Sequence, residues 1–317
     1  MKRTVKITEN LEQFLKTRTI FLIVLTYHLF LVAPILAQES EFRGYSGIYF
    51  ISSHGETSCD GYFQRESYPQ KDRKKGSLFY EEMRLLEFGE REALIVSEIS
   101  ADNLPSFILD FVKITSSQKD SQGYTREVTL FVSPDYLSIG DSSDYFIIPM
   151  GPLSAQTIAD RYNASLPTPK VVDIIYEHSV LKLEPFNYIP RRNRNETPDI
   201  LYDHSKVIQA QMRAAGYPAG TFVAGTKKDI VISSKLSDPN RTRHVTIYGW
   251  HKLDGKPIQP VTNVHINTYV DYSHGVRLVS NRVLVDGIEY KFGDILKDTL
   301  LHTLLSYEDV PLAVVRY

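Results

Sequence analysis

Short apolar runs of β-branched and aromatic residues recur through the first half of the chain, separated by polar stretches that contain Gly or Pro. The runs occupy residues 46–51, 93–96, 107–112 and 128–132. Runs of this length between turn-forming residues are typical of β-strands. Ser133, Pro134 and Asp135 follow the last run and favour a turn that ends it. The pattern therefore predicts a β-rich N-terminal part.

The apolar residues change to helical spacing near residue 150. Three helices are expected, over residues 154–162, 169–176 and 205–216. Ser154 and Thr168 are suitable N-cap residues, and Pro169 suits the first position of the helix that follows it. Gly216 is expected to end the third helix. Residues 184–198 are polar and rich in Pro, Arg and Asn, so they predict a surface loop.

The strand pattern returns in the C-terminal part of the chain. Strands are expected over residues 229–232, 244–248, 257–259, 269–279 and 282–285, and a last helix over residues 295–305. Residues 253–256 predict the turn of a hairpin. The order of strands, helices, strands and helix predicts an α+β fold, with a helical middle and an antiparallel or mixed sheet in the C-terminal part.

The N-terminus has the pattern of an export signal. Five basic residues come first: Lys2, Arg3, Lys6, Lys16 and Arg18. Residues 20–36 are then almost continuously apolar, and Ala37 precedes a polar segment. This layout predicts a signal peptide over residues 1–37, a β-rich region over 38–150 and an α+β region over 151–317 that carries the site. We expect the mature protein to be extracytoplasmic, either periplasmic or secreted.

The alternative for the N-terminal segment is an uncleaved membrane anchor, because about 17 apolar residues approach the length of a membrane span. Contact with a membrane is expected only in that case. The formal net charge of −2 argues against a general nucleic-acid binder. Cys59 is the only cysteine in the sequence, so the chain cannot form an internal disulfide or a cysteine-clustered zinc site.

Side chains of catalytic type concentrate between residues 227 and 277. Four of the nine histidines fall within residues 244–274, and the only tryptophan, Trp250, lies beside one of them. The candidate catalytic residues are His251, Asp271, Ser273 and His274. The candidate substrate-binding residues are Lys228, Tyr248, Trp250, Tyr272 and Arg277.

Each catalytic candidate has an expected role. A histidine acts as general base, Asp271 orients it or binds a metal, and Arg277 holds an anionic group. On a strand, Ser273 and His274 would face opposite sides, so His251 is the expected base for a nucleophilic Ser273. The alternative is that His274 is a hydrogen-bonded structural histidine and that Asp271 caps a turn.

A metal centre is a second interpretation of the same side chains. His251, His265, Asp271 and His274 offer nitrogen and oxygen ligands that zinc accepts, and an open zinc site activates water near neutral pH. Their spacing matches no compact zinc motif. Zinc is therefore the one cofactor considered, and no metal ligand is assigned.

Several short motifs resemble those of a family of uncharacterised exported bacterial proteins. They lie at residues 132–137, 166–168 and 224–229, at Tyr-Gly-Trp-His (248–251) and at Asp-Tyr-Ser-His-Gly-x-Arg (271–277). The resemblance covers roughly residues 128–280. It implies a bacterial origin and export, and it implies no particular reaction.

Residues 273–278, Ser-His-Gly-Val-Arg-Leu, are also similar to the Ser-His-Gly-Cys-x-Arg signature of L,D-transpeptidases, which cross-link peptidoglycan. His251 lies upstream, as the second histidine of that family does. Val276 stands where the nucleophilic cysteine of the family should be. Thiol acylation of that kind is therefore not available at this segment, and the resemblance implies at most a related sheet geometry.

Three functions are open at this point. The first is an exported bacterial hydrolase that acts on a cell-envelope or extracellular polymer. The alternative is a non-enzymatic module that binds a glycan or a peptide, with Tyr248, Trp250, Tyr269 and Tyr272 as an aromatic platform. The third is a structural envelope protein whose histidines serve only its core. The expected partner is a cell-envelope polymer or a small ligand.

Overall fold

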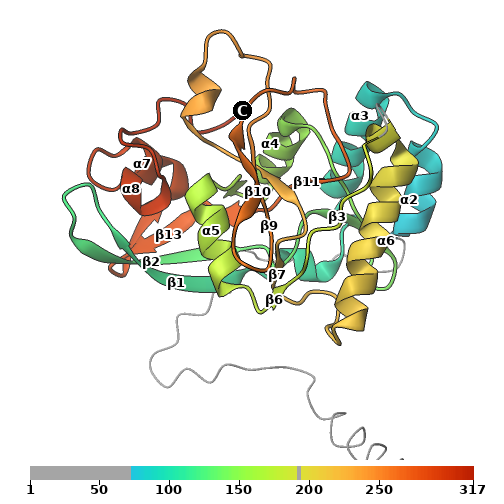
Figure 1. The fold of residues 1–317 in the computed structure, drawn as a ribbon, viewed down its shortest axis with the longest axis horizontal. Helices are drawn as coiled ribbons and strands as arrows, with labels where there is room; N and C mark the ends of the chain where they lie inside the picture. The colour runs from blue at the N-terminus through green and yellow to red at the C-terminus, as the bar shows by residue number, and fades with distance from the viewer. Residues whose placement is uncertain (1–72, 191–193) are drawn as a thin grey trace, which may run out of the picture. The chain divides into compact units, whose positions relative to one another are not determined.

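A sheet of six strands is built around β2 (Thr125–Val132) in the computed structural model, which describes residues 73–190 and 194–317 (Figure 1). β1 (Val112–Lys119) runs antiparallel to β2 along its whole length. The other edge of β2 pairs with β12 (Val279–Ser280) and β13 (Arg282–Val285). The remaining strands of this sheet are β14 (Ile288–Lys291), beside β13, and β5 (Ala164–Ser165), beside β12.

A second sheet of four strands has the order β10-β9-β8-β11. Its strands are β8 (Lys228–Ile230), β9 (Ile247–His251), β10 (Pro257–Thr262) and β11 (His274–Gly275). β8 and β9 are antiparallel, whereas β11 runs parallel to β8 with His274 opposite Lys228. The predicted hairpin between β9 and β10 is confirmed, and Gly255 takes the positive φ of +83° that the turn requires. This sheet brings both candidate segments together.

Two pairs of short strands and seven helices complete the described part of the chain. The strand pairs are β3 (Ser138–Gly140) with β4 (Tyr145–Ile147), and β6 (Leu181–Lys182) with β7 (Val223–Ala224). The helices are α2 (Gly76–Met83), α3 (Phe88–Ser100), α4 (Pro152–Arg161), α5 (Pro169–His178), α6 (Pro198–Ala214), α7 (Phe292–Lys297) and α8 (His302–Leu305). Figure 1 shows α2, α3 and α6 at one end of this unit and α7 and α8 at the other.

Helix α5 begins as its sequence predicts. The Thr168 side chain accepts a hydrogen bond from the Val171 amide at 3.2 Å, and Pro169 occupies the first helical position. Val171 and Ile175, four residues apart, are buried against the core. The capping chemistry and the apolar stripe lie within a few residues of each other, so the local sequence is sufficient to set this helix.

Two predicted strands before β1 are wrong. Residues 93–96 lie inside α3, where Glu87 and Glu90 form a reciprocal capping box and Ile95 and Ile99 are buried one turn apart. A four-residue apolar run does not distinguish a strand from a buried helix face, and here the helical spacing decides. Residues 106–109 form a 3₁₀ turn, and the strand starts only at Val112.

Other boundaries also differ from the predictions. Helix α4 begins at Pro152 with Gly151 as its N-cap, so Ser154 does not cap it, and β9 begins at Ile247 and not at residue 244. Helix α6 begins at Pro198, seven residues before Ser205, which is buried and accepts a hydrogen bond from the Ile147 amide. The predicted end at Gly216 is confirmed by its φ of +79°. The expected helix over residues 295–305 is two short helices, and most of the expected strand over 269–279 is a turn followed by β11.

The α+β class is confirmed, but the change near residue 150 does not divide the fold. The described residues, 73–190 and 194–317, form one compact unit, because β2 from the first half pairs with β12 and β13 from the second. The predicted signal peptide, the run at 46–51 and Cys59 lie outside the described residues. Over residues 73–190 and 194–317, no helix has the length and apolar character needed to cross a bilayer.

Candidate functional site

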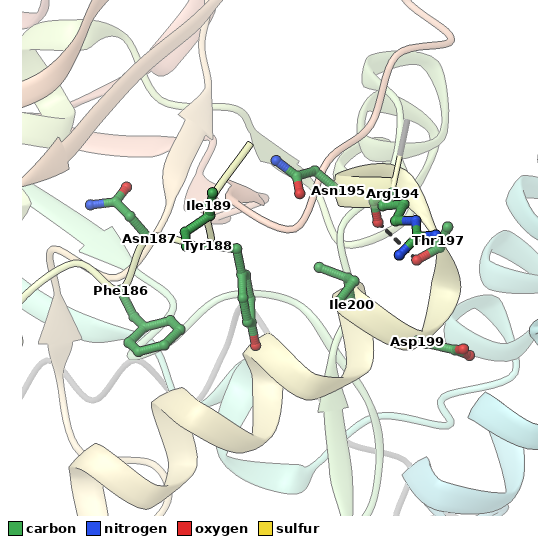
Figure 2. A pocket seen from close by; sticks show the side chains of 9 residues that line it. All are labelled: Phe186, Asn187, Tyr188, Ile189, Arg194, Asn195, Thr197, Asp199 and Ile200. Carbon is green, nitrogen blue, oxygen red and sulfur yellow. Dashed lines mark hydrogen bonds between the residues drawn. The ribbon is translucent and has the colours of Figure 1, made fainter. Parts of the chain in front are cut away.

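A pocket of about 610 Å³ opens between the loop that follows β6 and the start of α6 (Figure 2). Its lining residues are Phe186, Asn187, Tyr188, Ile189, Arg194, Asn195, Thr197, Asp199 and Ile200. This volume is in the range of pockets that hold a small molecule or one segment of a polymer. The loop was expected from the sequence, but its hollowed surface was not.

One side of the pocket is apolar. Figure 2 shows the Tyr188 ring between Phe186 on one side and Ile200 on the other. The Phe186 and Tyr188 rings meet edge to face at 5.1 Å. Phe186 is 40% exposed and Ile189 is 72% exposed, although large apolar side chains are usually covered. A partly exposed aromatic pair in a concave site is a feature of ligand-binding surfaces.

The other side of the pocket is polar. Asp199 accepts a hydrogen bond from the Tyr80 hydroxyl at 2.7 Å and lies 3.6 Å from the Arg84 guanidinium, so its charge is already balanced. Arg194 is exposed and makes no ion pair within the described ranges. Asn195 contributes an amide that can both donate and accept. Among the described residues that line the pocket, Arg194 is therefore a cation that can meet a ligand.

Tyr272 lies directly behind the pocket and joins its two sides. Its hydroxyl accepts a hydrogen bond from the Tyr188 amide at 3.0 Å, and its own amide donates to the Asn195 carbonyl at 3.1 Å. The Tyr272 and Tyr188 rings pack edge to face at 4.8 Å. Tyr272, predicted as a substrate-binding residue, is buried and supports the pocket from within.

A buried lysine–histidine pair lies beneath the same loop. The Lys227 ammonium donates to the Tyr272 carbonyl at 2.6 Å and to His204 Nδ1 at 3.0 Å. His204 Nε2 faces the Phe186 carbonyl at 3.2 Å, which places the ring proton on Nε2. Burial lowers the pKa of Lys227 to about 7. Burial, with the nearby Lys227 charge, also lowers the pKa of His204 well below its usual range.

Asp271 organises a turn that leads into β11. Its carboxylate accepts hydrogen bonds from both the amide and the hydroxyl of Ser273, and from the Tyr269 hydroxyl at 3.1 Å. The Lys228 ammonium lies 3.9 Å away. Burial alone would raise the pKa of Asp271, but the cationic forms of His274 and Lys228 and the Ser273 bonds outweigh it, so the pKa is lowered. The interpretation of Asp271 as a turn cap is confirmed.

His274 lies beside this turn with an unusual environment. The residue is 1% exposed, and neither ring nitrogen has a hydrogen-bond partner among the residues that the structure describes. Its ring packs edge to face on Tyr269 at 5.8 Å. Burial lowers the pKa of His274 to about 4, so the ring is neutral at pH 7. The interpretation of His274 as a hydrogen-bonded structural histidine is therefore wrong.

His251 belongs to a different cluster, centred on Asp173 of α5. His251 Nε2 lies 2.9 Å from the Asp173 carboxylate, which also accepts hydrogen bonds at 2.8 Å from the Tyr248 and Tyr307 hydroxyls. The His251 ring stacks on Tyr176 with centroids 4.6 Å apart. The Ser273 hydroxyl donates to Asp271 and not to His251. The structure therefore does not form the predicted Ser273–His251 pair.

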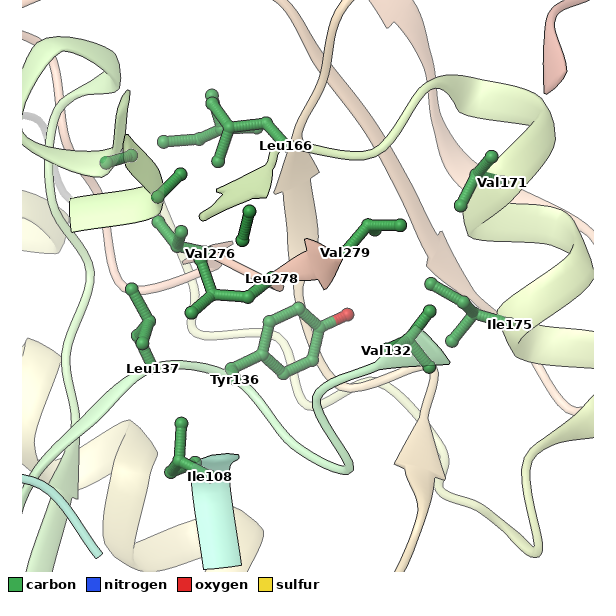
Figure 3. Close-up of a cluster of buried hydrophobic side chains, with 14 of the residues drawn as sticks. Ile108, Val132, Tyr136, Leu137, Leu166, Val171, Ile175, Val276, Leu278 and Val279 are labelled. Carbon is green, nitrogen blue, oxygen red and sulfur yellow. The ribbon is translucent and has the colours of Figure 1, made fainter. Parts of the chain in front are cut away.

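Arg277 is enclosed in the core. Its guanidinium donates to the Ser133 carbonyl at 2.8 Å and to the Val223 carbonyl at 2.7 Å, and it lies 4.3 Å from the Tyr136 ring centroid. Figure 3 shows Tyr136 surrounded by apolar side chains, among them Leu278. At 1% exposure, Arg277 holds two backbone segments together. The Arg277 guanidinium therefore has no exposed surface at which it could perform its predicted role of binding an anionic substrate group.

Three of the four residues of the predicted aromatic platform are also buried, and the fourth, Tyr269, is partly exposed. Trp250 and Tyr248 are less than a tenth exposed, and the Lys228 ammonium lies 5.0 Å from the Trp250 ring. The exposed aromatic surface is at Phe186 and Tyr188 instead. Apolar residues within the otherwise polar segment 184–198 were the sequence signal that could have indicated it.

The described residues contain no group of three or more His, Cys, Asp or Glu placed to hold a metal ion. His251 and His274, two of the proposed zinc ligands, lie in the separate Asp173 and Asp271 clusters. No family model, curated protein or solved structure matches the chain. Both motif resemblances therefore stay predictions.

Proposed function

We propose that this chain is an exported bacterial protein that binds a saccharide segment of a cell-envelope or extracellular polymer in the pocket of Figure 2. The pocket itself carries the proposal. It combines a cavity of about 610 Å³, an aromatic pair of the exposed Phe186 and the partly buried Tyr188, and several hydrogen-bonding side chains. Small-ligand sites usually have this composition, with mostly apolar walls and a few polar groups that fix orientation.

A saccharide fits both sides of the pocket. A sugar ring presents an apolar face of C–H groups, which packs on the Phe186 and Tyr188 rings, and an edge of hydroxyl groups. Asn187 and Asn195 can donate to and accept from those hydroxyls. The exposed Arg194 guanidinium matches a carboxylate in geometry and charge. We therefore expect sugars that carry a carboxylate to bind more tightly than their neutral counterparts.

Calorimetric titration with soluble peptidoglycan saccharides and with their carboxyl-reduced forms tests this function. Tyr188→Ala should weaken binding at least about tenfold, because it removes one wall of the pocket. Tyr124→Ala is the matched control, since Tyr124 is exposed in the distant turn between β1 and β2. Equal affinity of the Tyr188 variant and wild type would reject the pocket as the site. Binding of peptides without sugars would reject the saccharide assignment.

A hydrolase remains the second candidate, and one observation favours it. His274 is a neutral, buried imidazole whose two nitrogens have no hydrogen-bond partner in the described part of the chain, beside the ionised Asp271 and the Lys228 ammonium. Unpaired buried polar groups and shifted pKa values concentrate at catalytic sites. In this proposal, His274 accepts a proton from the water that attacks the anomeric carbon, and the Lys228 ammonium donates a proton to the glycosidic oxygen that leaves.

Release of reducing ends from purified cell walls would measure hydrolysis. His274→Gln should abolish the release while leaving saccharide affinity at the pocket unchanged. His251→Gln serves as the comparison, because His251 belongs to the Asp173 cluster and is expected to leave turnover intact in the folded protein. Absence of any release by the wild-type protein would leave binding as its function.

A further inference from the structure

We propose that Lys227 is a positioning residue for the pocket, acting through His204 and Tyr272. The two walls of the pocket do not belong to any sheet. Between Lys182, the last residue of β6, and the 3₁₀ turn at Arg194–Glu196, the described chain has no regular secondary structure. A loop wall without its own ladder of backbone hydrogen bonds has to be held from outside if it is to keep one shape.

The first residues of the loop are held by the Ala224 carbonyl, which accepts from the Leu183 amide, and by the Gln211 side chain, which donates to the Glu184 carbonyl. Three further hydrogen bonds hold the described residues of the loop and of the 3₁₀ turn that line the pocket. His204 Nε2 bonds the Phe186 carbonyl, the Tyr272 hydroxyl accepts from the Tyr188 amide, and the Tyr272 amide donates to the Asn195 carbonyl. Each of these three bonds is made by His204 or Tyr272. Both of these residues are in turn bonded to the Lys227 ammonium. Lys227 is therefore bonded to both of the residues that support the walls of the pocket.

The rings add a second layer of contact. The Tyr272 ring packs edge to face on Tyr188 at 4.8 Å and on His204 at 4.9 Å, while His204 and Tyr188 are 6.0 Å apart. The three rings form one cluster whose outer member, Tyr188, is also a wall of the pocket. A shift of Tyr272 or His204 would therefore move the surface that a ligand contacts.

Lys227 is a costly residue to keep for stability alone. It is 0% exposed, and its direct partners are a carbonyl and an imidazole. Within the described residues it makes no ion pair, and Asp271 and Asp135 act on it only at longer range. Burying a cation without a paired carboxylate is unfavourable, and an apolar side chain of similar size often stabilises such a site. A role in placing its neighbours accounts for its retention.

The positioning role makes a prediction that involves no ligand. Hydrogen–deuterium exchange of the free full-length protein would compare wild type with Lys227→Met, which keeps the length of the side chain and removes its donors. Amides of residues 186–189 should exchange at least about tenfold faster in the variant, since their supports lose their common anchor. Amides of β1 and β2 should keep their wild-type rates. Lys256→Met, at an exposed hairpin position, is the matched control.

Unchanged exchange at residues 186–189 in a folded Lys227→Met protein would overturn the proposal. If that variant does not fold, His204→Phe and Tyr272→Phe decide the question. Each keeps a ring, and the first removes two bonds of the network whereas the second removes one. Faster exchange confined to the loop in both would support it, and wild-type rates in both would overturn it.

The choice of a saccharide as the ligand rests on the proposed function. Titration of the same variants with that saccharide tests whether the positioning role affects binding. If wild type binds a saccharide, Lys227→Met should weaken the affinity about tenfold at an unchanged melting temperature, which a purely structural role would not produce. If wild type binds none, the proposed function fails. The exchange result still tests whether Lys227 positions the loop.

Discussion

Asp173 and Asp271 are the centres of two polar clusters that border the same four-stranded sheet, and each has a histidine nearby. In the Asp173 cluster, the carboxylate is bonded to His251 and to two tyrosine hydroxyls. In the Asp271 cluster, the carboxylate is bonded to Ser273 and Tyr269, while the His274 nitrogens have no partner among the described residues. The aspartate and the histidine are therefore bonded to each other in the Asp173 cluster and are not bonded to each other in the Asp271 cluster.

This difference indicates what each histidine contributes. A buried ring that is bonded to a carboxylate and stacked on Tyr176, as His251 is, stabilises the fold in an ordinary way. A buried polar group without a hydrogen-bond partner lowers the free energy of unfolding by about 1–3 kcal/mol, and the buried ring of His274 has two nitrogens that are unpaired within the described part of the chain. The fold retains His274 despite that cost, which is the pattern expected of a functional group.

The largest expected effect comes from the same substitution in both clusters. His251→Leu should lower the free energy of unfolding by about 3 kcal/mol, because it removes a hydrogen bond to a carboxylate and an aromatic contact. His274→Leu should leave it unchanged or raise it, by up to about 1–3 kcal/mol, because it removes two unpaired polar atoms at similar volume. Urea unfolding of both variants measures the contrast, and equal losses would remove the distinction between the clusters.

A pH dependence of stability sharpens the comparison further. The pKa of His274 is lowered from 6.5 to about 4 in the folded protein, so the unfolded chain binds more protons between these values. Titration of His274 therefore does not affect stability above pH 6.5 and lowers it as the pH falls to 4, by up to about 1.4 kcal/mol per unit. Urea midpoints of wild type and His274→Leu should diverge over this window, and parallel curves would contradict the lowered pKa.

The smallest effects are expected for the single donors to each carboxylate. Ser273→Ala removes a buried hydroxyl that donates to Asp271 and should cost about 1 kcal/mol. Tyr307→Phe removes a hydroxyl that donates to Asp173 from an exposed side chain and should cost less than about 0.5 kcal/mol. Thermal unfolding measures both changes. A larger loss for Tyr307→Phe would indicate that the Asp173 cluster depends on its exposed donor.

The positions of the candidate residues within the sheet could be predicted only in part. The hairpin between β9 and β10 and the parallel neighbour β11 follow strand patterns that the sequence contains. The direction of each side chain does not, because Gly249 and Trp250 both have positive φ, +106° and +59°. Residues with positive φ break the regular alternation of side chains between the two faces of a strand. A non-glycine residue such as Trp250 rarely has a positive φ. His251 therefore ends in the Asp173 cluster.

Local chemistry in the sequence was sufficient for the helix that begins at Thr168 and Pro169, for the turn at Gly255 and for the α+β order of elements. In each case the deciding interactions lie within about four residues of one another, as N-caps and hairpin turns require. The short apolar run at 93–96 shows the limit of such signals, because its helical or extended state depends on which face the rest of the fold covers.

Only the tertiary structure separated His251 from His274, buried Arg277 and Lys227 and formed the pocket at Phe186 and Tyr188. The partners involved are distant in sequence: Arg277 bonds Ser133 and Val223, and Lys227 bonds His204 and Tyr272. Burial and pairing are properties of the assembled core, and a sequence pattern reports only the residues beside each position. The physical reason is that a polar side chain's partner is chosen by packing across the fold.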